Sequence, residues 1–410
     1  MNAKIFLGID AGGKEHALAA MDENEQVIWE SRIGNTHEGF VPLLKKIEDW
    51  QNDGIEIWVG AEGIGGYLSP LDRLLCARDC KYVSIQPKQY QRYREAMEWQ
   101  PDKTDEKDAR GLAAFVHSLY KKEKARVSDR SDEYFETLRT TARALTQTTQ
   151  SKVVLQNQMV SATREYWPEL FLDDYFSRSD TKGILALLQA YPTPQAVVNA
   201  GRNEVANVLS TASRGDQREL AGRLVKQARE ILKLSPGLSV SLAKATLVQS
   251  LAEGVYRLTC ILSDIERQLD EQLQNHPFGK WLLEQEGIGP RTAGCFLGEA
   301  GNLDRFETDA QLSRYAGTGP VINQSGQSKG HHWDAHRYNH RLKRAVLLLT
   351  ESRCRHHALS KLYVNSRKNQ KGDYWKLIKK LARHIIRYLW NGWKQVCLEA
   401  GCPSQTIEAT

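Results

Sequence analysis

The feature that most constrains the fold is a stretch in the middle of the chain that contains neither glycine nor proline. It runs from Ser131 to Trp167, directly before Pro168. Glycine and proline are the residues that most strongly interrupt helices, so we expect one continuous helix here. At about 1.5 Å per residue this helix is roughly 55 Å long, far longer than the average helix of a globular domain.

A second long helical stretch is expected from Leu242 to His276, with only Gly254 as a weak interruption. Shorter helical pieces containing Pro192, Pro194 and Gly201 lie between the two. The pattern predicts a coiled-coil-like arm over residues 126–278. Because the apolar positions do not form clean heptads, an intramolecular helical hairpin and a dimer zipper are about equally compatible with it.

The first part of the chain has a different pattern. Short apolar runs predict strands at residues 4–10, 16–21, 26–33, 55–61 and 81–85, and helices at 36–50, 67–78 and 105–120. Thr36 is the expected N-cap of the first of these helices. Strands that alternate with helices predict a mixed α/β domain over residues 1–125.

Acidic residues occupy the ends of these predicted elements. Asp10 ends the first strand and Glu62 follows the fourth, while Asp105 and Asp108 lie three apart on one face of a helix. The carboxyl ends of strands are where open α/β sheets build their sites. Clustered carboxylates repel one another unless a cation neutralises them, and Mg²⁺ or Mn²⁺ prefers such oxygen ligands.

A pair of these ions can activate an attacking oxygen and stabilise the leaving oxygen of a phosphodiester. Each acidic residue alone also has a structural explanation, as a turn residue, a cap or a solvated side chain. The joint pattern favours a metal site.

Charge is distributed unevenly along the chain. Residues 280–410 hold 21 Lys and Arg against 11 Asp and Glu, whereas residues 1–279 hold 35 against 39. A basic last third indicates a polyanionic partner, and a solvated basic surface is the alternative.

Two classes of protein are disfavoured by the sequence. No apolar run approaches the ~18 residues that span a bilayer, and no signal peptide precedes the first strand, so we expect a cytoplasmic protein without a membrane partner. The seven cysteines are scattered, which disfavours a disulfide framework. Cys76 and Cys80 are expected to serve packing rather than metal binding.

The last third, residues 279–410, is expected to be mainly helical, with helices at 308–316, 336–355 and 374–396. It contains the sequence E-G-I-G-P-R-T-A between two helical stretches, which resembles a helix–hairpin–helix turn. Gly287 and Gly289 permit backbone conformations that other residues avoid, and the N–H groups of the next helix can hold a phosphate. An ordinary helix–helix turn is the alternative.

A long polar loop follows, with the sequence Y-A-G-T-G-P-V-I-N-Q-S-G-Q-S-K-G from Tyr315 to Gly330. Ser325 in this loop is a candidate nucleophile, although serine is a weak one without activation. Further residues are candidate nucleic-acid contacts: Gly287, Gly289, Arg291, Lys329, Arg341, Lys343, Arg344, Lys376, Lys379, Lys380, Arg383 and Arg387.

Five ordered motifs resemble those of the DEDD-type insertion-sequence transposases and the related Piv-type invertases. They are G-I-D at 8–10, A-E-G at 61–63, K-T-D-E-K-D-A at 103–109, G-I-G-P-R-T-A at 287–293 and Y-A-G-T-G-P-V-I-N-Q-S-G at 315–326. The resemblance covers both ends of the chain.

This resemblance implies a RuvC-like, RNase-H-like N-terminal domain and a serine-bearing C-terminal transposase domain. It implies that Asp10, Glu62, Asp105 and Asp108 are metal ligands and that Ser325 is the nucleophile, with both parts meeting in a composite site. It also implies a recombinase of a bacterial or archaeal mobile element. Its partners would be the DNA of element ends and target, a structured bridge RNA as guide, and further copies in a homodimer or homotetramer.

Two other functions remain open from the sequence. One is a RuvC-like nuclease that hydrolyses branched DNA with the carboxylate domain alone. The other is a non-catalytic architectural protein that binds nucleic acid. The four acidic residues argue against the second, and the serine loop in a separate basic domain argues against the first.

Overall fold

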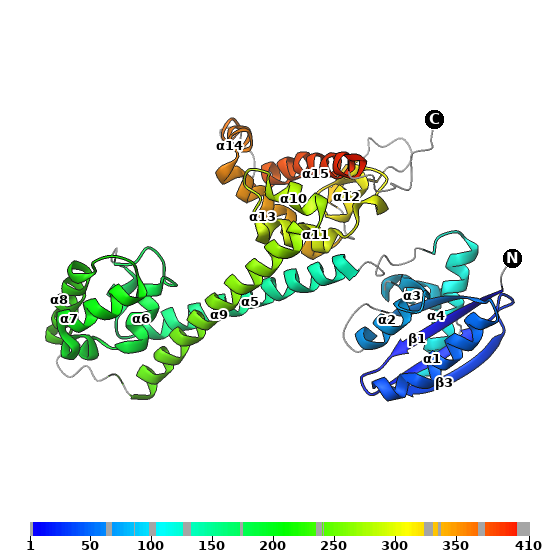
Figure 1. Ribbon diagram of the computed structural model, residues 1–410, viewed down its shortest axis with the longest axis horizontal. Coiled ribbons are helices and arrows are strands. Elements are labelled where there is room, and N and C mark those ends of the chain that lie inside the picture. The colour runs from blue at the N-terminus through cyan, green and yellow to red at the C-terminus, as the bar shows by residue number, and fades with distance from the viewer. Residues whose placement is uncertain are drawn as a thin grey trace. The chain divides into compact units, whose positions relative to one another are not determined.

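The computed structural model describes residues 3–62, 68–85, 87–97, 104–125, 133–172, 175–234, 240, 242–323, 331–334, 338–367 and 374–399. The chain divides into two compact units, residues 1–133 and 134–410, which are described separately (Figure 1). The three-part division at residues 125 and 278 stays a prediction.

The first unit is built on a mixed five-stranded sheet with the order β3-β2-β1-β4-β5. The strands are β1 (Lys4–Ala11), β2 (Glu15–Met21), β3 (Val27–Gly34), β4 (Glu56–Glu62) and β5 (Lys81–Ile85). β1, β2 and β3 are antiparallel neighbours, whereas β4 is parallel to both β1 and β5. The α/β character expected from the sequence is confirmed.

Helices cover both faces of this sheet. On one face, Ile5, Leu7 and Ile9 of β1 pack with α1 (His37–Asn52) and α2 (Ser69–Cys76). On the other face, Phe6 of β1 packs with α3 (Pro87–Met97) and α4 (Asp105–Lys121). The unit is therefore a three-layered α/β structure.

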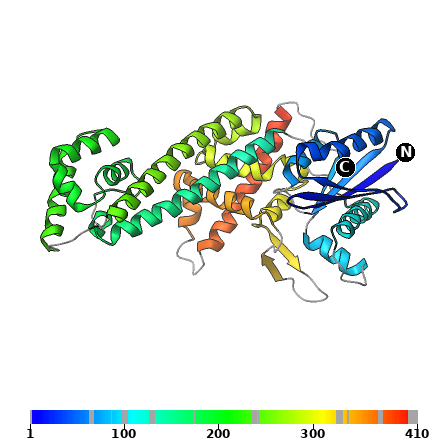
Figure 2. The ribbon, with the colours of Figure 1, turned by 90° about the horizontal axis from the view of Figure 1, so that it is seen from below.

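The second unit is crossed by two long helices, α5 (Glu133–Arg164) and α9 (Leu242–Gln274), which lie side by side in Figures 1 and 2. They pack against each other within one chain, as an intramolecular hairpin. Tyr134 donates its hydroxyl to the Gln272 carbonyl near one end of the pair. Each helix supplies side chains to two separate hydrophobic cores.

The first of these cores belongs to a helical bundle at one end of the long helices. It contains η2 (Pro168–Phe171), α6 (Lys182–Ala190), α7 (Pro194–Ala212) and α8 (Arg218–Leu234). Trp167 is fully buried at its centre and donates its indole N–H to Gln227 of α8. We refer to residues 165–241 as the tip bundle.

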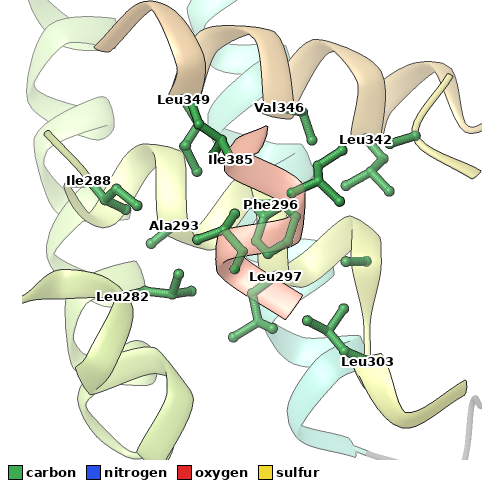
Figure 3. Close-up of a cluster of buried hydrophobic side chains, with 14 of the residues drawn as sticks. Leu282, Ile288, Ala293, Phe296, Leu297, Leu303, Leu342, Val346, Leu349 and Ile385 are labelled. Atoms are coloured by element: carbon green, nitrogen blue, oxygen red, sulfur yellow. The ribbon is translucent and has the colours of Figure 1, made fainter. Parts of the chain in front are cut away.

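The second core lies at the other end of the long helices (Figure 3). Its elements are α10 (Pro277–Leu283), α11 (Pro290–Ala300), η3 (Leu303–Arg305), α12 (Asp309–Tyr315), the hairpin β6 (Pro320–Asn323) and β7 (His331–Asp334), α13 (His340–His356), α14 (Ala358–Asn365) and α15 (Tyr374–Glu399). Phe296 of α11, Val346 of α13 and Ile385 of α15 all belong to this core (Figure 3). The mainly helical character expected for this part is confirmed.

The structure corrects one expected boundary. The helix expected from His336 begins at His340, because the Asn339 side chain accepts the backbone N–H groups of Arg341 and Leu342 and so caps the helix there. Among the described helices, none is both long and apolar enough to cross a membrane.

Candidate active site

The end of β1 and the start of α4 are brought together by close backbone packing. A Cβ atom on Gly8 would lie 2.0 Å from the Ala109 carbonyl oxygen, so only glycine allows α4 to lie this close to the strand. A Cβ atom on Gly60 of β4 would likewise lie 2.1 Å from Cγ2 of Val116. These two glycines define the face of the sheet that α4 covers.

Strand register then places Asp10 and Glu62 next to each other. β1 and β4 are parallel, with Ile9 opposite Ala61, so the next residues of the two strands are neighbours at their carboxyl ends. Residues two apart in a strand belong to the same face, so positions 10 and 62 share the face of Gly8 and Gly60. Asp10 is half-buried there.

The helix α4 contributes the other two acidic positions from its first turn. Thr104 caps the helix by accepting the backbone N–H of Lys107 at 3.3 Å. Because Gly8 packs against Ala109 and Phe6 against Val116, α4 runs opposite to β1 and begins beside its carboxyl end. Asp108 is buried and Asp105 is exposed.

Two arginines bind these aspartates. Nη1 of Arg94 in α3 lies 2.9 Å from Oδ1 of Asp108. Nη2 of Arg32 in β3 lies 3.6 Å from Oδ2 of Asp105, and the same guanidinium donates two hydrogen bonds to Glu106. The pKa of Glu106 is held below its ordinary value by its backbone hydrogen bond and then by Arg32. Neither arginine was predicted from the sequence as part of the site.

The acidic positions suit a hard divalent cation by their chemistry, because all four offer carboxylate oxygens. Within the described residues, however, no three His, Cys, Asp or Glu side chains are grouped closely enough to hold a metal ion. The fold thus gathers the positions at one edge of the sheet, and the ligand role of the four residues stays a prediction. Cys80, by contrast, is buried in the core, where burial raises the pKa of its thiol to about 12.

The glycine-rich motif forms a turn between α10 and α11. Gly287 has a φ of +79°, and a Cβ atom there would lie 3.0 Å from Cα of Arg353 in α13. Gly289 caps α11, and Thr292 closes the cap by accepting the Gly289 N–H. Arg291 is bound to Glu266 at 3.0 Å. The expected turn between two helices is present, whereas its role as a helix–hairpin–helix motif and its contact with phosphate stay predictions.

The predicted nucleophile, Ser325, lies outside the described residues, as does Lys329. The base of their hairpin is described and is held on both sides. Asn339 donates its backbone N–H to the Tyr315 carbonyl at 2.8 Å. Arg383 donates Nε–H to the Thr318 carbonyl at 2.6 Å. These contacts hold Tyr315, Thr318 and Asn339, the described residues that flank the β6–β7 hairpin.

A buried glutamate, Glu299, holds one of the residues that flank the hairpin. Glu299 of α11 is bound by Arg143 of α5, with Nε and Oε1 2.7 Å apart, and by the Asn339 amide. Burial alone would raise the pKa of Glu299, but the Arg143 hydrogen bond and charge hold it below its ordinary value. Glu299 was not predicted from the sequence, although a lone acid in the apolar stretch F-L-G-E-A-G is a signal that could have found it.

The remaining predicted nucleic-acid contacts divide by their surroundings. Arg387 is bound to Asp309 at 2.9 Å, and Lys343 lies over the Tyr338 ring. Lys379 is half-buried. Arg387 is exposed although it is paired, and the exposed members without such a pairing among the described residues are Arg341, Arg344, Lys376 and Lys380.

Two family models match separate parts of the chain. A DEDD-type IS110 model described as a transposase matches residues 7–168. A second model, described as a transposase of the IS116/IS110/IS902 family, matches residues 279–365.

Individual relatives match along most of the chain. An uncharacterised 42 kDa protein of insertion element IS900 from Mycobacterium paratuberculosis is 23% identical, covering 95% of this chain and 96% of that protein. An uncharacterised 44.8 kDa protein of insertion element IS116 from Streptomyces clavuligerus is 24% identical, covering 94% of each. A putative transposase for the IS117 mini-circle of Streptomyces coelicolor is 24% identical, covering 84% of this chain and 83% of that protein.

The chain is thus a transposase, an enzyme that cuts and rejoins DNA. It belongs to the IS110 family of DEDD-type transposases. A divalent metal requirement follows for an enzyme of this type.

Proposed function

We propose that the protein recombines the DNA of a mobile element with two sets of groups. One is a divalent-metal site made by Asp10, Glu62, Asp105 and Asp108 on an RNase-H-like, RuvC-like domain. The other is Ser325, acting as the nucleophile. The observation that carries the proposal is the parallel register of β1 and β4, which makes positions 10 and 62 neighbours where α4 begins.

The acidic residues would hold Mg²⁺ or Mn²⁺ through their carboxylate oxygens. The bound ion would stabilise the negative charge that develops on the phosphate oxygens. Arg94 orients the buried Asp108 carboxylate from the α3 side. Arg32 does the same for Asp105 from β3. Both arginines also offset the mutual repulsion of closely spaced acids.

Ser325 would attack a DNA phosphorus through its hydroxyl oxygen. The new bond joins serine to phosphorus, the bond between phosphorus and the leaving strand oxygen breaks, and the hydroxyl proton passes to a base or to the leaving oxygen. Attack by a hydroxyl of the incoming strand then releases serine. Covalent capture conserves the phosphodiester energy, which rejoining needs and hydrolysis does not.

The contacts of the residues that flank the β6–β7 hairpin support this role, since a nucleophile works best when the elements around it are held in place. Asn339 and Arg383 make these contacts.

We also propose that target choice is made by a structured guide RNA and that the working form is a homodimer or homotetramer. The exposed cations Arg341, Arg344, Lys376 and Lys380 support binding of a phosphate backbone. The resemblance to bridge-RNA-guided recombinases is the basis for the guide itself.

The test of the nucleophile is a reaction on end-labelled DNA that is stopped with denaturant. Wild-type protein should give a protein–DNA adduct that maps to Ser325. Ser328→Ala, three residues away, should keep the adduct, whereas Ser325→Ala should lose both the adduct and recombination. Full recombination by Ser325→Ala would overturn the serine mechanism and leave water as the attacking group.

A further inference from the structure

The tip bundle presents a row of cations on one helix. Arg218, Lys226, Arg229 and Lys233 of α8 are all exposed. At 3.6 residues per turn they fall within an arc of about 80° on the helix surface. A separate, apolar side of α8 faces the bundle core through Ala221, Leu224, Val225 and Ala228.

A fifth cation is added from the neighbouring helix. Gly201 has a φ of +74° and breaks α7, so that the chain turns just before Arg202. Arg202 then donates Nε–H to the Arg218 carbonyl at 3.1 Å. A Cβ atom on Gly222 would lie 3.3 Å from this nitrogen, so the glycine leaves room for the guanidinium beside α8.

These cations differ in their partners from cations where the bundle meets the long helices. Lys152 of α5 and Arg178 both bind Asp180 at 2.8 Å, and Lys244 of α9 binds Glu165. Within the described part of the chain, no acidic group lies within 4.0 Å of the cationic groups of Arg218, Lys226, Arg229 or Lys233. The positive charges of these four side chains are therefore available to an external anion.

Two glutamates border the row of cations along one side of the α8 surface. Glu219 and Glu230 are exposed on α8 next to Arg223, whose guanidinium lies over the Tyr175 ring at 5.1 Å. The positive strip is therefore narrow and runs along the helix axis. From Arg218 to Lys233 it extends about 22 Å.

This geometry suits the backbone of a duplex. One strand of DNA carries a phosphate about every 3.4 Å along the axis, so the length of the strip spans about six base-pair steps. Because each strand winds around the axis once in about ten base pairs, the strip faces a part of these phosphates. α8 has no aromatic residue, and stacking on aromatic rings is what binding of single strands needs. Charge without stacking favours the phosphate groups of a double helix.

We propose that the cationic strip formed by Arg202, Arg218, Lys226, Arg229 and Lys233 binds the phosphate backbone of duplex DNA, independently of the carboxylate and serine groups. The tip bundle is then a second DNA contact of the enzyme, reached through the paired helices α5 and α9.

The test measures affinity of the full-length protein for a 40-base-pair DNA duplex of mixed sequence by fluorescence anisotropy, across a salt series and without divalent metal. The variant Arg229→Gln/Lys233→Gln removes two charges of the strip. Its matched control, Arg257→Gln/Arg267→Gln, removes two charges from α9 that are bound to acids on their own helix. Circular dichroism verifies that both variants are folded.

We expect the strip variant to lower the slope of log affinity against log salt by about 1.8, since each neutralised phosphate contributes about 0.9. The control should leave the slope unchanged, and the charge-preserving swap Arg229→Lys/Lys233→Arg should retain wild-type binding. An unchanged slope in the strip variant overturns the proposal. A loss seen with duplex RNA of the same length and not with DNA overturns the assignment to DNA. Because no cleavage is involved, either result leaves the proposed active site untouched.

Discussion

Asp108 is the acidic residue whose surroundings are best defined. It is 6% exposed, and its carboxylate is bound by Arg94. A buried carboxylate without a partner is costly, so the arginine stabilises the charged form. The same arrangement, less buried, joins Arg32 to Asp105. At the scale of single residues, two of the four candidate acids, Asp105 and Asp108, are each paired with an arginine.

The residue-scale prediction concerns Asp10. Asp10→Asn keeps the size of the side chain and removes its charge, so DNA strand cleavage in Mg²⁺ should fall by at least about 100-fold if this carboxylate stabilises developing charge. Cleavage of labelled duplex measures the rate, and thermal unfolding should be nearly unchanged. Glu48→Gln, an exposed acid on α1, is the control and should cleave normally. Near-normal cleavage by the Asp10 variant would remove this residue from the site.

The four acidic positions could be predicted from the sequence as candidate site residues, whereas the arginines that pair with two of them could not. Asp10, Glu62, Asp105 and Asp108 stand next to predicted strand ends and a predicted helix start, which are local signals. Arg32 reaches α4 across 74 residues of chain to Glu106. Such a pairing depends on the strand order, which spacing along the sequence does not specify. Ser325 was likewise predicted from the sequence, and its role as nucleophile stays a prediction that the protein–DNA adduct experiment tests.

At the scale of elements, β1 and α4 form the decisive contact. Gly8→Ala would bring a methyl group to 2.0 Å from the Ala109 carbonyl, so α4 must move away from the sheet. We expect a loss of about 1–3 kcal/mol in the free energy of unfolding, together with reduced cleavage. Urea unfolding measures the first quantity.

The control for this change is Gly34→Ala at the end of β3, where the nearest atom to an added Cβ is Oγ1 of Thr36 at 3.9 Å. That variant should unfold within about 1 kcal/mol of wild type, since a strand-end alanine meets no obstacle. Equal stability of the two variants would contradict the packing argument for Gly8.

Most elements of the first unit were predictable because their signals are local. Thr36 caps α1 as expected, by accepting the Gly39 N–H, and the five strands lie where the apolar runs placed them. The helix α3 was not predicted, because it is polar and buries only Tyr90. Its place is set by the Tyr90 hydroxyl, which donates to the Asp108 carbonyl on α4. That is a tertiary contact, which no local pattern contains.

At the scale of the whole molecule, positive charge is concentrated in the last third of the chain. Residues 280–410 offer exposed cations to a polyanion, as their composition already indicated. The strip on α8 was hidden, because residues 1–279 are slightly acidic in sum. Only the fold separates the paired cations of the bundle from the unpaired ones.

The whole-molecule prediction concerns guidance. Protein freed of RNA by nuclease and high salt should still bind DNA but should fail to recombine specific sites, because phosphate contacts carry no sequence information. RNA transcribed from the non-coding part of the element should restore recombination, and an unrelated RNA of equal length should not. Site-specific recombination by the RNA-free protein would contradict guidance while leaving the transposase assignment intact.

The pairing of α5 with α9 has a consequence for how chains of this kind can differ. The two helices run in opposite directions, and a Cβ atom on Gly254 of α9 would lie 3.0 Å from Leu155 of α5. The tip bundle is thus joined to the adjacent ends of α5 and α9, so it resembles a module inserted into the turn of a helical hairpin. Shortening or replacing residues 165–241 would alter the far end of the hairpin and keep the order of every other element. Length differences among related transposases can therefore accumulate at this point without disturbing the carboxyl ends of β1 and β4 or the β6–β7 hairpin.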